Sequence, residues 1–283
     1  MISANNRLIE MNRIIIILLV SILIVSCAQK PQHKDEIPKH QTLTISSTFV
    51  HEERIINIWT PANYKQSTDS LAVLYMADGG IQEDFPHIAN TLSELIENNS
   101  IPPIILVGIE NTERGRDLTG FSETEDDAQY SPLTDGAKDF RAFIIEELMP
   151  EINNTYRTTH EKGLIGESLS GLFVMETLFI QPTAFDFYIA MDPSLWWNNH
   201  YLVRMATDYL DKFPDMEIKL WFAGSGVQDI SKHTNSLAKV LEKYDPKYLQ
   251  WKYVDKPKEK HYTIFRATKE EALIWSLNTN NVK

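Results

Sequence analysis

Hydrophobic and polar residues alternate along this chain with two different periods, and each period predicts a different kind of element. Residues 43–50 and 54–59 alternate every second position around an acidic break, which predicts an antiparallel hairpin. The uninterrupted apolar run at 71–77 predicts a buried strand. Further strands are expected at 104–109, 162–166, 185–191, 216–223 and 248–254, and helices at 83–98, 136–149, 169–180, 199–212, 231–243 and 264–277.

This alternation of strands and helices predicts the α/β fold class, with a mostly parallel sheet covered by helices on both faces. No repeat and no internal linker interrupts the pattern, so residues 41–283 are expected to form one domain. A domain of that length buries about three-quarters of its unfolded surface, which is enough for a stable core without disulfides.

The amino-terminal segment has the pattern of an export signal. Residues 14–26 form an apolar run without a charge, preceded by Arg7 and Arg13. The run is shorter than the roughly 20 residues that cross a bilayer, so residues 1–26 are expected to be a signal peptide. The compact segment that begins at Met11 favours this methionine as the initiator over Met1.

Cys27, the single cysteine of the chain, directly follows the apolar run in the sequence I-V-S-C. This resembles the bacterial lipobox, which implies acylation of Cys27, for example with palmitate. The polar, proline-containing residues 27–40 are then expected to be a flexible tether. The implied location is the cell envelope, on its periplasmic or surface face, with the protein held at the membrane by its lipid anchor. An ordinary signal peptide followed by a chance cysteine is the alternative.

Charge excludes one class of partner. Lys and Arg number 27 against 39 Asp and Glu, so the formal net charge is −12. A nucleic-acid binder needs a basic face to displace counterions from phosphates, so no nucleic-acid partner is expected. A lone cysteine also excludes a thiolate zinc cluster, and no metal site is expected.

The strongest chemical motif is Gly166-Glu167-Ser168-Leu169-Ser170, between a predicted strand and a predicted helix. It is close to the G-x-S-x-G nucleophile elbow, whose sharp turn projects a serine hydroxyl above the sheet. Ser168 is therefore the expected nucleophile, with Ser170 standing where the second glycine is usual. The alternative is a serine that caps a helix in a turn without catalytic function.

A serine nucleophile of this kind needs a histidine base and an acid, in the chain order Ser, acid, His. His261 follows the last predicted strand, where the elbow architecture places its base. Asp229, after the penultimate strand, is the favoured acid, with Asp255 and Asp192 as competitors at other strand ends.

Two backbone amides are expected to stabilise the oxyanion of the tetrahedral intermediate. One is the amide of Leu169, which follows the nucleophile. The other is expected from the glycines after the strand at 71–77, with Gly80 preferred over Gly79.

Several segments together resemble the Putative esterase family of α/β hydrolases, the esterase D and enterobactin-esterase-like group. They are L-Y-M-A-D-G-G, I-P-P-I-I-L-V-G-I-E-N-T-E-R-G-R-D-L-T, the elbow, M-D-P-S-L-W-W-N-N and the late histidine, within residues 55–275. The resemblance implies the α/β-hydrolase fold and hydrolysis of carboxylic esters by Ser168 and His261, without a cofactor. Asp192 stands where a serine is common in the family, which leaves the identity of the acid open.

Two of these segments suggest the walls of a substrate site. Arg114 and Arg116 are candidates to hold an anionic or catecholate substrate, and internal salt bridges are their alternative role. Trp196 and Trp197 are candidates to line an aromatic or acyl pocket, and packing beneath the loop is equally open. The favoured substrate is a siderophore trilactone. Feruloyl or acetyl esters of polysaccharides, or a noncatalytic lipoprotein that retains the fold, are the alternatives.

Overall fold

The computed structural model describes residues 35–278. The predicted signal peptide, Cys27 and the first part of the tether lie outside the described residues. The last residues of the predicted tether contact the domain. The Asn90 side chain donates a hydrogen bond to the Glu36 carbonyl at 2.9 Å, and the His40 ring packs edge-on against Phe85 at 5.5 Å between ring centres.

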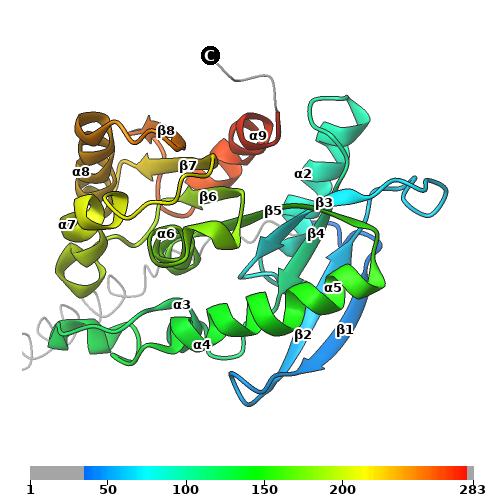
Figure 1. Cartoon of the computed structure of the whole chain (residues 1–283), viewed down its shortest axis with the longest axis horizontal. Coiled ribbons are helices and arrows are strands. Elements are labelled where there is room, and N and C mark those ends of the chain that lie inside the picture. The colour runs from blue at the N-terminus through cyan, green and yellow to red at the C-terminus, as the bar shows by residue number, and fades with distance from the viewer. Residues whose placement is uncertain (1–34, 279–283) are drawn as a thin grey trace, which may run out of the picture. The chain divides into compact units, whose positions relative to one another are not determined.

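The centre of the domain is an eight-stranded sheet in the order β1-β2-β4-β3-β5-β6-β7-β8 (Figure 1). β1 and β2 form the predicted antiparallel hairpin, and β2 also runs antiparallel to β4. The other neighbouring pairs are parallel. The strands are β1 (Gln41–Ser46), β2 (Glu53–Trp59), β3 (Leu71–Met76), β4 (Ile104–Ile109), β5 (Thr158–Glu167), β6 (Phe187–Met191), β7 (Ile218–Ser225) and β8 (Leu249–Lys256).

Helices cover both faces of this sheet, as the alternation predicts. α2 (Phe85–Glu97) and α9 (Ile264–Leu277) pack on one face, and the remaining long helices lie on the other (Figure 1). The described helical segments also include α3 (Arg114–Leu118), η1 (Glu125–Gln129), α4 (Gly136–Ala142), η2 (Phe143–Leu148), α5 (Met149–Thr155), α6 (Leu169–Ile180), η3 (Pro182–Ala184), α7 (Trp197–Leu210) and α8 (Gln228–Tyr244).

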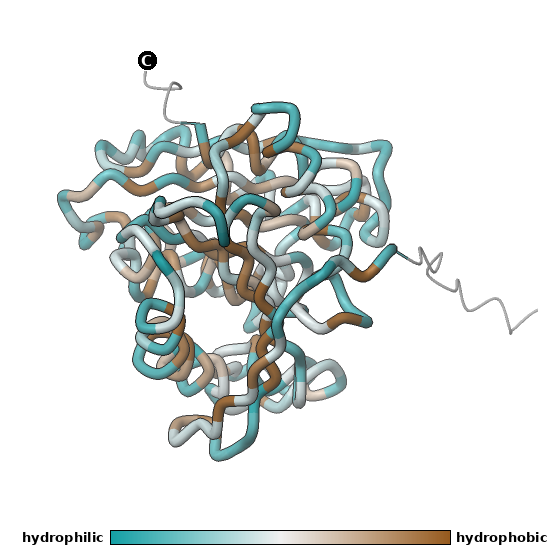
Figure 2. Tube along the Cα trace, turned by 90° about the vertical axis from the view of Figure 1, so that its right-hand side faces the viewer, coloured by the Kyte–Doolittle hydropathy of each residue, from teal (hydrophilic) through white to brown (hydrophobic). Residues whose placement is uncertain are grey.

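Side chains alternate between two apolar cores, one on each face of the sheet. In β3, Val73 and Tyr75 enter the core beneath α4 to α8, whereas Leu74 and Met76 enter the core beneath α2 and α9. This is the period of two that a strand imposes. Because both faces are covered, the central strands are apolar throughout, and Figure 2 shows these hydrophobic segments running through the interior.

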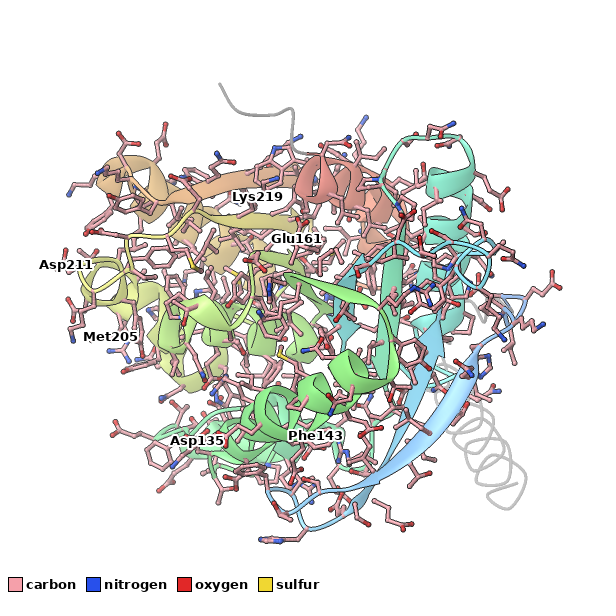
Figure 3. The ribbon with its side chains drawn as sticks, turned by 45° about the vertical axis from the view of Figure 1, so that its right-hand side comes forward. Asp135, Phe143, Glu161, Met205, Asp211 and Lys219 are labelled. Carbon is pink, nitrogen blue, oxygen red and sulfur yellow. The ribbon has the colours of Figure 1, made fainter. Side chains whose placement is uncertain are left out.

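The predicted helix at 136–149 is irregular in the structure. The helix expected at 136–149 begins where Asp135 accepts a hydrogen bond from the Lys138 amide, but it changes to a π-helix at Phe143 and regains α geometry at Met149 (Figure 3). Pro150 lacks the N–H that an α-helix would use at this point, and its ring crowds the carbonyl one turn earlier. The pattern of apolar residues is the same for both helix types, so it did not reveal the change.

The parallel strands place several loops at one edge of the sheet. The segments that follow β3, β5, β6 and β8 all leave from carboxyl ends of parallel strands, where α/β proteins build their sites. Among the described residues, no helix is both long and apolar enough to span a bilayer.

Candidate active site

Ser168 occupies the sharp turn between β5 and α6. Its backbone angles are φ 62° and ψ −119°, a conformation that costs energy for a residue with a side chain. The turn is held by a hydrogen bond from the Ser168 amide to the Met191 carbonyl, at 3.0 Å. Gly166 permits the turn because a Cβ there would lie 2.6 Å from the backbone of Ser170. The strained serine of the predicted elbow is therefore present.

Ser170, the departure from the elbow pattern, bonds across the same turn. Its hydroxyl accepts a hydrogen bond from the Glu167 amide and donates one to the Glu167 carbonyl, both at 2.8 Å. The side chain is 1% exposed. A glycine could make neither bond, so the serine replaces backbone freedom with two local hydrogen bonds that fix the turn.

His261 connects the Ser168 hydroxyl to a buried carboxylate. Its Nε2 lies 2.9 Å from Ser168 Oγ, and its Nδ1 lies 2.6 Å from Asp192 Oδ2. A carboxylate facing Nδ1 favours the tautomer with the proton on that nitrogen, which leaves Nε2 as the acceptor for the serine proton. The Asp192 side chain is fully buried, and its other oxygen accepts a hydrogen bond from the Ser225 amide at 2.6 Å.

The structure therefore places Asp192, and not the favoured Asp229, against His261. Asp229 lies exposed in the first turn of α8, where its charge favours the helix amino terminus, and Asp255 is exposed in β8. Asp192 directly follows β6, the neighbour of β5 in the sheet, and its φ of 46° turns the chain there. The signal for it in the sequence was an aspartate directly after an apolar strand and before a proline.

The loop that carries His261 rests on the end of β7. The Gly226 amide donates to the Glu259 carbonyl at 2.9 Å, and a Cβ on Gly226 would lie 2.3 Å from the Pro257 carbonyl oxygen. Only glycine allows so close an approach of the two backbones. Sequence reasoning missed Gly226, because its contact is with a loop about 30 residues away.

The two predicted oxyanion donors, the amides of Leu169 and Gly80, differ in whether they already have a hydrogen-bond acceptor. No acceptor in the described part of the chain is assigned to the Leu169 amide, which opens α6 beside Ser168. The Gly80 amide instead donates to the Glu83 carboxylate at 2.7 Å. The Gly79 amide donates to the Ile109 carbonyl and extends the sheet. Leu169 is therefore available as a donor, whereas Gly80 already has a partner.

The two predicted substrate-binding arginines, Arg114 and Arg116, also differ in their ion-pair partners. Arg114 forms a two-pronged pair with Asp78 through Nε and Nη2, at 2.6 and 2.7 Å, and its side chain is 38% exposed. Within residues 35–278 its Nη1 has no assigned acceptor, which leaves donors for a ligand. Burial lowers the pKa of Arg114, but the hydrogen bonds and charge of Asp78, with the charge of Glu167, raise it overall, so the side chain stays cationic.

Arg116 belongs to a partly buried ion network instead. Its guanidinium contacts Glu52 and Asp117, and Arg54 contacts the same two carboxylates from the other side. Hydrogen bonding to Arg116 holds the pKa of Glu52 at about 2, and the same pair raises the pKa of Arg116. The alternative role of Arg116 as an internal salt bridge is therefore the one that the structure supports.

Trp196 and Trp197 have separate environments. Trp197 is 5% exposed, and its Nε1 donates to the Gly120 carbonyl at 3.0 Å, so it packs the loop at 110–135 against α7. Trp196 is half-buried, with its ring 4.9 Å from that of Tyr130, a side chain 60% exposed. Trp196 and Tyr130 remain as an aromatic wall beside the loop that carries Asp192.

Comparisons with known proteins identify the family of this chain. Residues 46–270 match the family described as Putative esterase. The chain is 34% identical over 128 residues to the ferri-bacillibactin esterase BesA of Bacillus subtilis, and this match covers 40% of this chain and 44% of that protein. It is 37% identical over 78 residues to the siderophore enterobactin esterase of Emericella nidulans, over 26% of each chain. The matched segments thus span less than half of these relatives.

A solved structure extends the likeness over most of the domain. The IroE-like serine hydrolase of Shewanella oneidensis is 29% identical, with a TM-score of 0.75 over 84% of this chain and 79% of that one. This confirms the α/β-hydrolase fold. Because the family matches most of the chain, with the strained serine inside the match, the chain belongs to the Putative esterase family.

Proposed function

We propose that the protein is a serine carboxylic-ester hydrolase in which Ser168, His261 and Asp192 form the catalytic triad. The observation that carries this proposal is the continuous line from hydroxyl to imidazole to buried carboxylate, with distances of 2.9 and 2.6 Å. Histidine, at the centre of the line, accepts and returns a proton near neutral pH. The family and the names of the relatives support the same reaction class.

Acylation follows from this geometry. Ser168 Oγ attacks the ester carbonyl carbon while His261 Nε2 takes the hydroxyl proton. The resulting imidazolium is stabilised by Asp192, and the oxyanion lies near the Leu169 amide at the positive end of α6. Collapse of the intermediate breaks the bond to the alkoxide oxygen, which takes the proton from His261. The acyl group is then on Ser168.

Deacylation repeats these steps with water. His261 takes a proton from water, the hydroxide attacks the acyl carbonyl, and Ser168 leaves as its oxygen regains the proton. The carboxylic acid is released and the resting enzyme returns. Residues of this chain alone supply the nucleophile, base and acid.

A siderophore ester is the proposed substrate class. The relatives named above are a ferri-bacillibactin esterase and a siderophore enterobactin esterase. The free donors of Arg114 suit a planar anionic or catecholate oxygen pair, and the Trp196 ring suits a flat aromatic group. Arg116 is not part of this proposed subsite.

The activity is tested with p-nitrophenyl butyrate, followed by a screen of ferric and iron-free trilactones beside feruloyl and acetyl esters. Hydrolysis by the wild type and its loss in Ser168→Ala are expected. Ser236→Ala, which changes a partly exposed serine on α8, is the matched control. Equal rates for wild type and Ser168→Ala would refute the esterase, and a preference for feruloyl or acetyl esters would refute the siderophore assignment.

The envelope location is proposed from the sequence at 14–27. The short apolar run and the I-V-S-C ending support processing and acylation at Cys27. Incorporation of labelled palmitate into the full chain, with its loss in Cys27→Ala, is the expected result. Labelling that persists in Cys27→Ala would contradict the anchor.

A further inference from the structure

The carboxylate of Glu83 is held by hydrogen bonds to the loop that follows β3 and to Asn111. Its Oε2 accepts hydrogen bonds from the Gly80 amide at 2.7 Å and from the Asn111 amide at 3.4 Å. Its Oε1 accepts a bond from the Asn111 side chain at 2.9 Å. The arrangement resembles half of a capping box, in which an acidic side chain returns to an amide three residues earlier.

A second carboxylate holds the other side of this clamp. Asn111 Nδ2 also donates to Asp78 Oδ1 at 2.5 Å, and Asp78 is paired with Arg114. Asp78 is 6% exposed and has a φ of 56°, so the loop leaves the strand in a strained conformation that these bonds maintain. Burial raises the pKa of Glu83, and the charge of Asp78 adds to this, although the Gly80 bond opposes it.

The Gly80 amide belongs to the loop that follows β3, the strand that pairs with β5. Met76 pairs with Ile165 in the parallel ladder, so the loop after β3 leaves the sheet beside the turn that carries Ser168. α/β hydrolases take their second oxyanion donor from a loop of this kind. The Gly79 amide already donates a hydrogen bond to the Ile109 carbonyl, so the next amide that could donate to the oxyanion is that of Gly80.

Glu83 and a reaction intermediate compete for this amide. One N–H carries one hydrogen, so a full bond to the Glu83 carboxylate excludes a full bond to the oxyanion. A carboxylate at that position would also repel the negative charge that develops on the substrate oxygen. Both effects oppose the transition state while they leave binding of the neutral ester unaffected.

We propose that Glu83 is a latch on the second oxyanion donor: its carboxylate holds the Gly80 amide in the free protein and must leave before that amide stabilises the tetrahedral intermediate. This inference rests on the proposed esterase function. It makes the oxyanion hole incomplete in the resting protein, with Leu169 ready and Gly80 engaged. Substrate binding then completes the site, a form of induced fit.

Glu83→Gln tests the latch with little change of shape. A neutral amide oxygen is a weaker acceptor than a carboxylate, so kcat for p-nitrophenyl butyrate should rise by about three- to tenfold at unchanged KM. A butylboronic acid, which forms a tetrahedral adduct with a serine, should bind more tightly by a similar factor. Thermal stability should fall, because the clamp is weakened. Glu94→Gln, an exposed carboxylate on α2, is the control that should match wild type.

The alternatives give different results. If Glu83 only maintains the loop, Glu83→Gln lowers both kcat and stability, which overturns the latch; unchanged kcat and boronate affinity overturn it as well. Glu83→Ala serves as the second variant, and a rise in kcat at least as large is expected. Failure of the esterase proposal is separate, since wild type and Ser168→Ala would then show the same rate before any Glu83 variant is compared.

Discussion

Two polar clusters of this protein each contain a buried aspartate, Asp117 in one and Asp192 in the other, but the partners of the two carboxylates differ. In the network of Arg54, Glu52, Arg116 and Asp117, each carboxylate contacts both guanidinium groups, and the Arg54 side chain is fully buried. At the candidate active site a single carboxylate, that of Asp192, contacts the imidazole of His261, whose side chain is 35% exposed. The network joins β2 to α3, whereas Ser168 and His261 of the candidate site are both partly exposed.

The two clusters also differ in their backbone φ angles. Ser168 and Asp192 both have positive φ values, 62° and 46°, although neither is glycine. None of the four residues of the ion network is among the positive-φ residues of the described chain. The backbone is thus strained at Ser168 and Asp192, and the four residues of the ion network have no such strain. We expect variants in the site to change rate and variants in the network to change stability.

The largest effect is expected from Ser168→Ala. Loss of the nucleophile should lower kcat for p-nitrophenyl butyrate by about 10⁴- to 10⁶-fold. Because alanine relieves no packing and removes only one hydroxyl, the urea midpoint should be unchanged or slightly higher. Activity within tenfold of wild type would break the distinction between the clusters.

The next largest effect on kcat distinguishes Asp192 from Asp229, the acid that the sequence favoured. Asp192→Asn should lower kcat by about 10²- to 10⁴-fold, because the imidazole loses the partner that orients it and stabilises its charged form. Asp229→Asn is the matched control and should leave kcat within about threefold. The comparison is made with initial rates at saturating ester. A larger loss in Asp229→Asn than in Asp192→Asn would reverse the assignment.

Arg116→Ala should lower stability and leave kcat nearly unchanged. Removing one cation leaves Glu52 and Asp117 short of a partner in a half-buried site, so the free energy of unfolding should fall by about 2–4 kcal/mol. Since Arg116 lies in the ion network, kcat should change by less than about threefold. Urea unfolding and initial rates measure the two quantities. A collapse of kcat with normal stability would place Arg116 in the substrate site after all.

The smallest effect is a pH dependence of stability. The pKa of Glu52 is lowered from 4.5 to about 2 by its bonds to Arg116. A lowered pKa in the folded state gives stability that is complete above pH 4.5 and is lost as the pH falls toward 2. Glu52→Gln should therefore lower the free energy of unfolding by about 1–2 kcal/mol at pH 7, allowing for solvent screening.

The pH dependence of the stability difference between wild type and Glu52→Gln is the control for this prediction. The difference between wild type and Glu52→Gln should shrink steadily below pH 4.5, because the wild-type carboxylate becomes protonated. Urea midpoints at several pH values would show this. A difference that is constant with pH would mean that the side chain acts through shape and not through charge.

The parts of the site that sequence predicted are those with a local pattern. Ser168 and Leu169 lie in a five-residue motif between a strand and a helix, and His261 follows the last strand. Asp192 could not be separated from Asp229, because both follow predicted strands. The choice depends on which strand end faces His261 and on a positive φ that no neighbouring residue announces.

The remaining misses have a common cause, which is pairing between distant segments. Arg116 was a candidate for substrate binding until its partner Glu52, 64 residues earlier, was located. For Gly80, position in the sequence indicated an oxyanion donor but could not reveal the hydrogen bond to Glu83, which depends on the fold of the loop. The fold itself was largely predictable, because buried strands and amphipathic helices leave a periodic signal that does not depend on distant partners.

Labelling by a fluorophosphonate tests the triad most directly, because this reagent reacts much faster with a serine that a base has activated than with an ordinary hydroxyl group. With intact-mass and peptide analysis, we expect one adduct per wild-type chain, on Ser168, and none in Ser168→Ala. The labelling rate should fall by about 10²-fold or more in Asp192→Asn and remain near wild type in Asp229→Asn. An adduct on another residue, or equal rates in the two aspartate variants, would contradict the account.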